Sequence, residues 1–151
     1  MNLNEVIRRM PAWYIAGVNS QHGDPMKCAY LTSAPGRGKT TTLARAPDIL
    51  SKRLNKKIGL VIINGPLLTP ADSIGYLMPK HSKSVTGQDI TESVYTSPFW
   101  WRTAEGKRLE EYDGGIILVD EADKMDSDVK KVIGEAALSG RLGPHVLPLA
   151  G

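Results

Sequence analysis

The sequence predicts a single α/β domain built around a mainly parallel sheet. Two continuous apolar runs, 59–63 and 116–119, are rich in isoleucine, leucine and valine and have the length of strands. Such runs are typical of strands covered on both faces, as the strands of parallel sheets are. Segments with apolar residues at helical spacing lie between and after these runs, so strands and helices are expected to alternate.

A helix, a loop and a strand are expected in the first third of the chain. Apolar residues recur at helical spacing over 3–10, and Pro11 is expected to end this helix. The polar segment 19–25 is typical of a surface loop. Residues 27–32 are expected to form a strand that leads directly into a glycine-rich segment.

The middle of the chain is expected to contain helices and an insertion. Residues 39–55 suit a helix that Pro47 bends or splits. After the first apolar run, a turn and a short helix starting at Pro70 are expected. The polar stretch 80–97 has little periodicity and is expected to be partly irregular, so 80–101 is interpreted as a mobile insertion.

The last third combines an aromatic triplet, a strand and an amphipathic helix. Residues 99–101, Phe-Trp-Trp, are followed by a charged stretch that suits a helix or a hairpin. The run 116–119 is the expected strand, and apolar residues over 129–138 predict an amphipathic helix. Glycines within 140–143 end that helix, and 145–149 begin an extended segment.

Composition limits the classes of protein that the chain can belong to. A chain of 151 residues with 41% apolar and 23% charged residues is typical of one soluble domain, and no apolar run is long enough to cross a bilayer. Charges at Glu5, Arg8 and Arg9 argue against a signal peptide. The single cysteine, Cys28, allows neither an internal disulfide nor a thiolate metal site. We therefore expect a cytoplasmic location and no membrane contact.

The net charge of +3 does not by itself indicate a nucleic-acid partner. Lysines and arginines are spread along the chain in small clusters, which is typical of solvated helix faces and ends. Nucleic-acid binding is therefore left open as an alternative that the charge pattern does not indicate.

The glycine-rich segment 33–40 predicts a loop that holds a polyphosphate. In such loops the glycines let consecutive backbone N–H groups turn toward the phosphates, together with the N-terminus of the next helix. Lys39 is placed to reach the β- and γ-phosphates, and Thr40 is placed to bind Mg²⁺. Ser33 replaces the first glycine of the G-x-x-x-x-G-K-[ST] pattern; the alternative is a glycine-rich turn without a ligand. The residues expected to contact the nucleotide are Ser33, Ala34, Pro35, Gly36, Arg37, Gly38, Lys39, Thr40 and Thr41.

Two carboxylates, Asp120 and Glu121, follow the second apolar run at the end where open α/β sheets bind their ligands. Asp120 is expected to hold Mg²⁺ through water, and Glu121 is expected to orient and deprotonate the attacking water. Together with the loop, this pair predicts binding of ATP and Mg²⁺ and hydrolysis of ATP. The alternative is that Asp120, Glu121 and Asp123 only cap the following helix.

The chain resembles the core of an AAA+ ATPase, a P-loop NTPase with a three-layer sandwich, most closely the MoxR-like and dynein-related branch. Besides the two motifs, the resemblance rests on the stretches 65–75, 114–125 and 139–148. It implies a homo-oligomeric ring that remodels a protein client or acts with a partner subunit. AAA+ cores continue with a sensor asparagine, an arginine finger and a helical lid, so the single domain 1–151 is expected to be incomplete at its C-terminus and weak or inactive alone.

The same resemblance makes Asn64 a candidate site residue. In AAA+ proteins a polar residue at the end of the second strand can pair with the catalytic glutamate and switch it off, and Asn64 occupies that position. The alternative is an ordinary turn asparagine before Gly65 and Pro66.

Other interpretations stay open. The sequence 120–123, Asp-Glu-Ala-Asp, is also the signature of DEAD-box helicases, although their proline-threonine-arginine-glutamate motif is missing after the second strand. A nucleotide-binding or interaction module without turnover is a further alternative. Trp100 and Trp101 lie where AAA+ rings often carry a pore loop, but packing of the insertion or a subunit interface is the favoured interpretation.

Overall fold

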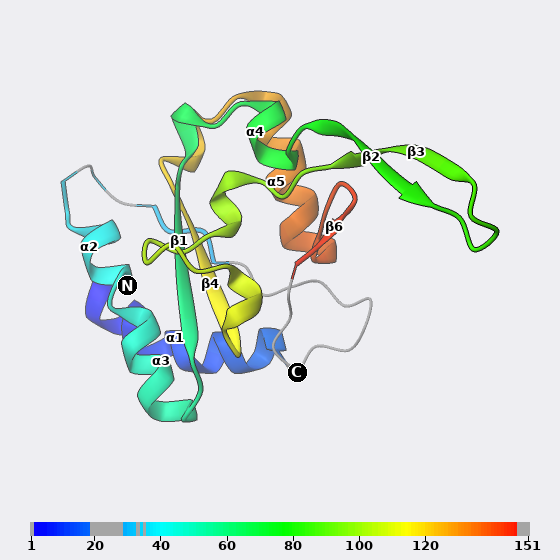
Figure 1. Ribbon diagram of the computed structural model, residues 1–151. Coiled ribbons are helices and arrows are strands. Elements are labelled where there is room, and N and C mark those ends of the chain that lie inside the picture. The colour runs from blue at the N-terminus through cyan, green and yellow to red at the C-terminus, as the bar shows by residue number, and fades with distance from the viewer. Residues whose placement is uncertain (1, 19–28, 33, 35, 148–151) are drawn as a thin grey trace.

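The computed structural model describes residues 2–18, 29–32, 34 and 36–147 and has a mixed α/β architecture (Figure 1). Its central sheet consists of two parallel strands, β1 (Ile58–Asn64) and β4 (Gly114–Asp120). The mixed α/β class is therefore confirmed. The sheet is smaller than the expected mainly parallel sheet, and the three-layer sandwich stays a prediction.

The strand expected over 27–32 is not formed in its described part, since residues 29–32 have no regular secondary structure. The side chain of Tyr30 is 69% exposed. A strand needs one covered face to hold its pairing, and this segment has little apolar surface against the rest of the domain. Residues 27 and 28 lie outside the described residues.

Helix α1 (Leu3–Val18) is longer than expected, because it continues through Pro11. The prediction that Pro11 ends the helix is therefore wrong. Proline removes one backbone hydrogen bond from a helix interior. Here the Pro11 ring is buried and the following Trp13 and Tyr14 are half-buried, so tertiary packing offsets that loss.

The split expected near Pro47 is confirmed. The segment forms α2 (Lys39–Leu43) and α3 (Ala46–Leu54), with the break at Ala44 and Arg45. Pro47 lies in the first turn of α3. A proline is tolerated there because the N–H that it lacks has no partner within the helix.

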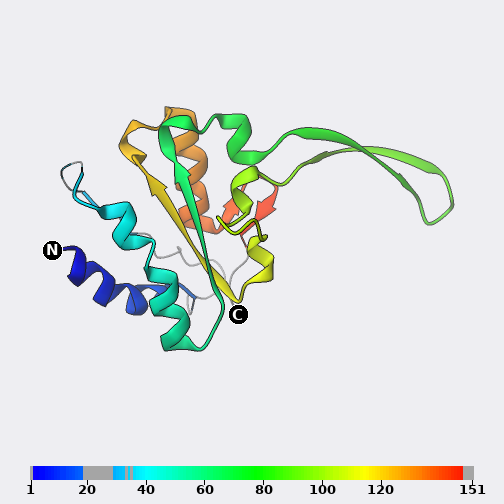
Figure 2. The ribbon, with the colours of Figure 1, turned by 60° about the vertical axis from the view of Figure 1, so that its left-hand side comes forward.

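The core lies between the sheet and the helix α5 (Ser127–Ser139), whose position along the chain was predicted. Figures 1 and 2 show α5 on one side of the sheet and α1, α2 and α3 on the other. The short helix α4 (Pro70–Ile74) begins at the expected Pro70 and packs near α5. The buried members of this core are Val61, Ile63, Leu68, Trp100, Trp101, Leu109, Met125, Val129, Ala136, Leu142 and Leu147.

Most of the segment 80–97 forms a regular antiparallel hairpin, which the sequence analysis did not predict, and only the turn and the end of the segment are irregular. The mobile insertion over 80–101 stays a prediction. Its strands are β2 (Leu77–Lys83) and β3 (Asp89–Tyr95), which pair in register from Leu77 with Tyr95 to Lys83 with Asp89. The turn between them contains Gly87, whose φ of 82° lies in the left-handed region that glycine enters most readily. In both ribbon views the hairpin extends away from the body of the domain (Figures 1 and 2).

The two tryptophans are part of the core. They lie in the short 3₁₀ helix η2 (Phe99–Trp101), and both are almost fully buried. The indole N–H of Trp100 donates to the backbone carbonyl of Ser73 at 3.2 Å. Burial of both rings supports the packing interpretation and argues against an exposed pore loop at Trp100 and Trp101. Phe99, the first residue of the triplet, is 68% exposed.

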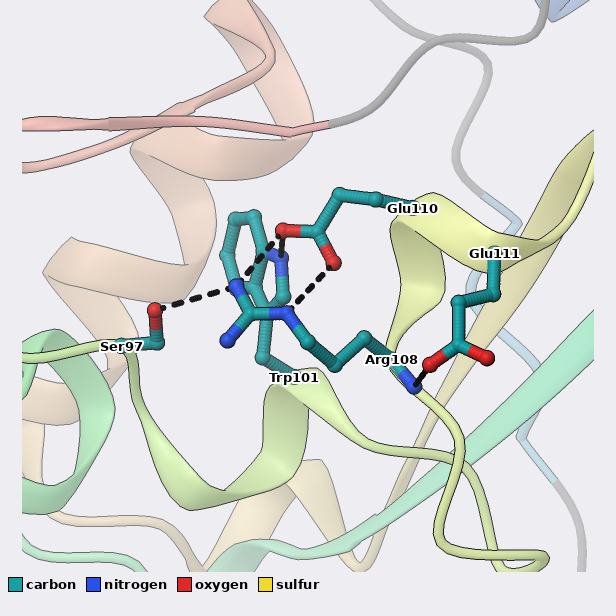
Figure 3. A network of polar contacts seen from close by, with 5 residues as sticks. All are labelled: Ser97, Trp101, Arg108, Glu110 and Glu111. Atoms are coloured by element: carbon teal, nitrogen blue, oxygen red, sulfur yellow. Dashed lines mark hydrogen bonds and ion pairs between the residues drawn. The ribbon is translucent and has the colours of Figure 1, made fainter.

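Glu110 holds the charged stretch after the tryptophans in place (Figure 3). It lies in the 3₁₀ helix η3 (Leu109–Glu111) and accepts from the Trp101 indole N–H at 2.7 Å. The Arg108 guanidinium donates to both Glu110 carboxylate oxygens, at 2.9 and 3.2 Å, and also to the Ser97 hydroxyl at 3.3 Å. These hydrogen bonds from Arg108 lower the pKa of Glu110.

The remaining elements are short. Strand β1 is followed by η1 (Gly65–Leu67) and strand β4 by η4 (Ala122–Lys124). The described chain ends in a small hairpin of β5 (Arg141–Leu142) and β6 (His145–Val146). Among the described residues, no helix is long and apolar enough to span a membrane.

Gly65 is packed directly under the end of β4. A Cβ atom there would lie 2.9 Å from the carbonyl oxygen of Asp120 and 3.0 Å from that of Glu121. We therefore expect Gly65→Ala to lower the free energy of unfolding by about 1–3 kcal/mol, because two backbone atoms must move. Denaturant unfolding measures this loss. Gly134→Ala in α5 is the control, since a Cβ there meets nothing within 4 Å and alanine favours the helix; equal effects at both positions would contradict the close packing of Gly65.

The lowered pKa of Glu110 predicts a pH dependence of stability. A carboxyl with a lower pKa in the folded state stabilises the fold above its ordinary pKa, and this contribution is lost as pH falls through the folded value. Wild-type protein should therefore lose stability between about pH 5 and pH 3 more steeply than Glu110→Gln. The difference should stay below about 1 kcal/mol, because the pair is partly exposed and screened. Glu135→Gln on the surface of α5 should follow the wild type in the same urea titrations; parallel curves for Glu110→Gln and wild type would rule out the stabilising role of Glu110.

Candidate functional site

The glycine-rich loop is described at Ala34 and from Gly36 onward, and Ser33 and Pro35 lie outside the described residues. Gly36 and Gly38 both have φ of 71°, in the left-handed region. A Cβ at Gly36 would meet no atom within 4 Å, so the need for glycine there is conformational and not steric. The two left-handed glycines are what a loop needs to turn successive N–H groups toward one point.

The loop leads into α2 in the way that the motif predicts. Lys39 is the first residue of this helix, and its side chain is half-buried, as is that of Thr40. Arg37 and Thr41 are exposed. Gly38 precedes the helix and has no side chain to cap it, an arrangement in which a phosphate can act as the acceptor instead.

A hydrogen bond joins the loop to the acid pair. The Thr40 hydroxyl donates to Asp120 Oδ2 at 2.6 Å, although the two residues are 80 positions apart in the chain. The other carboxylate oxygen, Oδ1, accepts from the backbone N–H of Glu121 at 3.0 Å. Both Asp120 oxygens are thereby oriented, and two motifs that sequence analysis found separately lie at one place.

This oxygen pair fits a magnesium ion that binds together with a polyphosphate. Mg²⁺ takes oxygen ligands and in nucleotide sites is usually held by one or two protein side chains, phosphate oxygens and water. Thr40 and Asp120 supply one hydroxyl and one carboxylate. In the part of the chain that the structure describes, no cluster of three or more acidic, histidine or cysteine side chains could hold a metal by itself.

Glu121 has an unusual backbone conformation. Its φ of 52° and ψ of 42° lie in the left-handed region, where a side chain is unfavourable by about 1–2 kcal/mol. Such conformations persist where the surrounding structure determines them, and they are frequent at functional sites. The conformation directs the chain from the end of β4 into η4.

Lys124 binds the Glu121 carboxylate and was not predicted as a site residue. Its Nζ lies 2.7 Å from Glu121 Oε1, and both side chains are well exposed. The hydrogen bond and charge of Glu121 raise the pKa of Lys124. Glu121 and Lys124 have opposite charges three positions apart, a spacing that predicts a side-chain contact only where the chain forms a helical turn. The turn here is η4.

Asn64 lies beside the acid pair but does not bind Glu121. The parallel register places Asn64 opposite Asp120. Among the described residues, the Glu121 carboxylate is bound by Lys124, and no hydrogen bond joins it to Asn64. A switching role for Asn64 therefore stays a prediction.

A hollow of about 380 Å³ lies away from these motifs, between α1 and α3. It shares no residue with the loop or with the acid pair. Its position therefore gives no support to the predicted site, which rests on the contact between Thr40 and Asp120. The hollow is lined by Asn4, Ile7, Arg45, Asp48, Ile49 and Lys52.

Comparisons of the chain with protein-family models, with curated proteins and with solved structures gave no match. The interpretation of the site therefore rests on the residues and their geometry.

The backbone of Glu121 gives a test that is independent of activity. Glu121→Gly and Glu121→Ala both remove the ion pair with Lys124, but only glycine enters the left-handed region without strain. We expect the glycine variant to be more stable than the alanine variant by about 0.5–1 kcal/mol in denaturant unfolding. Asn55, the other described residue with this conformation, is the comparison site for the same pair of substitutions. A more stable alanine variant at position 121 would show that the left-handed conformation is not adopted.

Proposed function

We propose that this chain binds ATP with Mg²⁺ through the loop 33–41 and hydrolyses it with the help of the acid pair at the end of β4. The observation that carries the proposal is the 2.6 Å hydrogen bond between Thr40 and Asp120. A phosphate-binding sequence and a strand-end carboxylate are each common alone. Their convergence on one oxygen pair is what a magnesium nucleotide requires.

Each residue has a separate role in this proposal. Lys39, at the first position of α2, neutralises charge on the β- and γ-phosphates. Thr40 and Asp120 would together hold the metal, Thr40 through its hydroxyl oxygen and Asp120 through its carboxylate or through a water bound to it. The bound Mg²⁺ would polarise the phosphate oxygens and neutralise charge as it develops.

Glu121 is the residue proposed to orient and deprotonate the attacking water. In the present structure its carboxylate is 2.7 Å from the Lys124 ammonium. Both side chains are exposed to solvent, which screens an ion pair of this kind, so breaking it adds little to a catalytic barrier. Glu121 can therefore leave Lys124 when a water and a γ-phosphate are in place.

The wider proposal is that the chain is the core of a ring-forming AAA+ machine that acts on a protein client. It is supported by the three stretches that resemble the MoxR-like and dynein-related branch and by the site described above. In such machines residues from a neighbouring subunit raise turnover by orders of magnitude. We therefore expect slow hydrolysis by this chain alone.

A second candidate is a nucleotide-binding module without turnover. The ion pair between Glu121 and Lys124 favours it, because the Lys124 ammonium occupies the carboxylate oxygen Oε1 at 2.7 Å, where an attacking water would otherwise bind. This candidate shares the nucleotide site with the first and differs only in the fate of the bound nucleotide.

Binding of a fluorescent ATP analogue, with Mg²⁺ or with EDTA, tests the site. We expect Mg²⁺ to increase the affinity of the wild-type protein and of Thr40→Ser for the ATP analogue. It should not increase the affinity of Thr40→Val, because valine keeps the shape of threonine but lacks its hydroxyl. Lys39→Ala should weaken binding at least about tenfold, or about 1.4 kcal/mol. A Thr40→Val variant that binds Mg-ATP as wild type does would contradict the proposed metal site.

Phosphate release separates the two candidates. Turnover that rises with protein concentration and is lost in Glu121→Gln, while that variant still binds the nucleotide, is expected for the hydrolase. Binding without phosphate release at any concentration would instead identify the module without turnover. Nucleotide affinity that is absent in wild type would overturn both.

A further inference from the structure

The hairpin of β2 and β3 is unusually uncovered. Every residue of the two strands is exposed except Ser82, which is half-buried. Both ribbon views show it projecting from the body of the domain (Figures 1 and 2). A two-stranded hairpin is only marginally stable in water, whereas a third strand or a packed face stabilises it.

The hydrogen-bonded pairing of β2 with β3 continues beyond the strands at both ends of the hairpin. At the base, the Thr96 N–H donates to the Tyr76 carbonyl at 2.8 Å, and the Tyr76 N–H donates to the Thr96 hydroxyl at 3.0 Å. At the turn, the Ser84 N–H donates to the Gln88 carbonyl at 2.8 Å. Gly75 allows the close approach at the base, since a Cβ there would overlap the Thr96 carbonyl group.

These end contacts fix the direction of every backbone group between them. Opposed residues of an antiparallel pair alternate between bonded pairs and pairs whose N–H and C=O groups point outward. Because the pairs Tyr76–Thr96 and Ser84–Gln88 are bonded, the odd-numbered residues of both strands point outward. These residues are Leu77, Pro79, His81 and Lys83 on β2 and Asp89, Thr91, Ser93 and Tyr95 on β3.

The two edges of the hairpin differ in their ability to bind another strand. On the edge of β2, Pro79 supplies no N–H, and proline and lysine are typical of edges protected against pairing. On the edge of β3, all four outward residues have both a donor and an acceptor. Only β3 therefore presents an uninterrupted row of backbone groups.

The charges of β3 select the kind of strand that can bind. Asp89 and Glu92 are its charged residues, and it carries no lysine or arginine. Lys80 and Lys83 of β2 lie directly opposite Glu92 and Asp89. In the described part of the chain, however, neither carboxylate has an ion pair or a side-chain hydrogen bond, so both can interact with a strand on the other side of β3. Directly opposed residues on neighbouring strands attract when their charges are opposite and repel when they are alike.

We propose that the outer edge of β3 binds an extended, basic segment of a partner protein as a third, antiparallel strand. Backbone hydrogen bonds to Thr91 and Ser93 give the affinity in this mode of binding, and side chains give the specificity. The partner segment carries lysine or arginine opposite Glu92 and Asp89. Its apolar residues lie beside Val94 and Tyr95, which are 37% and 41% exposed.

A second copy of the chain is a poorer occupant of this edge. Pairing of β3 with β3 of another copy brings Asp89 and Glu92 toward the same acidic residues. Pairing with β2 of another copy loses the donor at Pro79. The basic segment of a different protein avoids both costs, and its binding does not depend on the nucleotide site.

The test uses the whole chain and a labelled peptide, Leu-Met-Thr-Lys-His-Ser-Lys, in fluorescence anisotropy. Its sequence is that of β2 with threonine in place of Pro79, so its two lysines match Glu92 and Asp89 in the register of the hairpin. We expect saturable binding of this peptide.

A peptide N-methylated at its third and fifth residues, whose N–H groups face β3, should bind at least about tenfold more weakly. N-methylation at the fourth and sixth residues, whose N–H groups face away, is the matched control and should change affinity by less than about threefold.

Two further variants complete the test. A peptide with glutamate at both lysine positions should bind at least about tenfold more weakly at low salt, with a smaller difference at high salt. Ser93→Pro removes an outward donor of β3 and should abolish binding while the inner ladder of the hairpin, followed by amide NMR, is kept. Equal affinity for both N-methylated peptides, or no binding of the unmodified peptide, would overturn the proposal. Self-association of the chain that Ser93→Pro abolishes would show that a second copy occupies this edge instead.

Discussion

The parallel pairing of β1 with β4 is the constraint on which the rest of the structure depends. Its register places Asn64 opposite Asp120, so both strands end at the same edge. Gly65 then turns the chain under the Asp120 and Glu121 carbonyl groups, an approach that only a residue without Cβ allows. The strand pairing and Gly65 therefore position the acid pair independently of the glycine-rich loop. Thr40 reaches that position from the start of α2.

The candidate site combines rigid and adjustable parts. Asp120 is held by a hydroxyl and a backbone N–H, so its oxygens have defined directions. Glu121 adopts a strained backbone conformation, and its exposed side chain forms an ion pair with Lys124. In the function proposed here, the oriented Asp120 carboxylate would hold the metal, and the movable Glu121 carboxylate would position the attacking water.

Sequence analysis predicted the strongly patterned elements and missed those that depend on packing. The apolar runs became β1 and β4, and the amphipathic stretch became α5, because burial of their apolar residues agrees with local preference. Pro11 was assigned the end of a helix, but burial of its ring allows α1 to continue. The stretch that forms the hairpin of β2 and β3 was expected to be partly irregular, because its polar strands face solvent and lack a hydrophobic alternation. The open edge of β3 could not be predicted either. Which N–H groups point outward depends on the pairing register of the two strands, and the sequence did not predict that pairing.

The sequence by itself determined the kinds of residue that the site contains. The order of Gly36, Gly38, Lys39 and Thr40 and the position of Asp120 and Glu121 after an apolar strand depend only on local chemistry and chain direction. Tertiary structure alone decided that Thr40 meets Asp120 and that Lys124 binds Glu121. It also decided that both tryptophans are buried, and that the edge of β3 is uncovered. Contacts between distant segments depend on how helices and strands pack, and short motifs do not encode that packing.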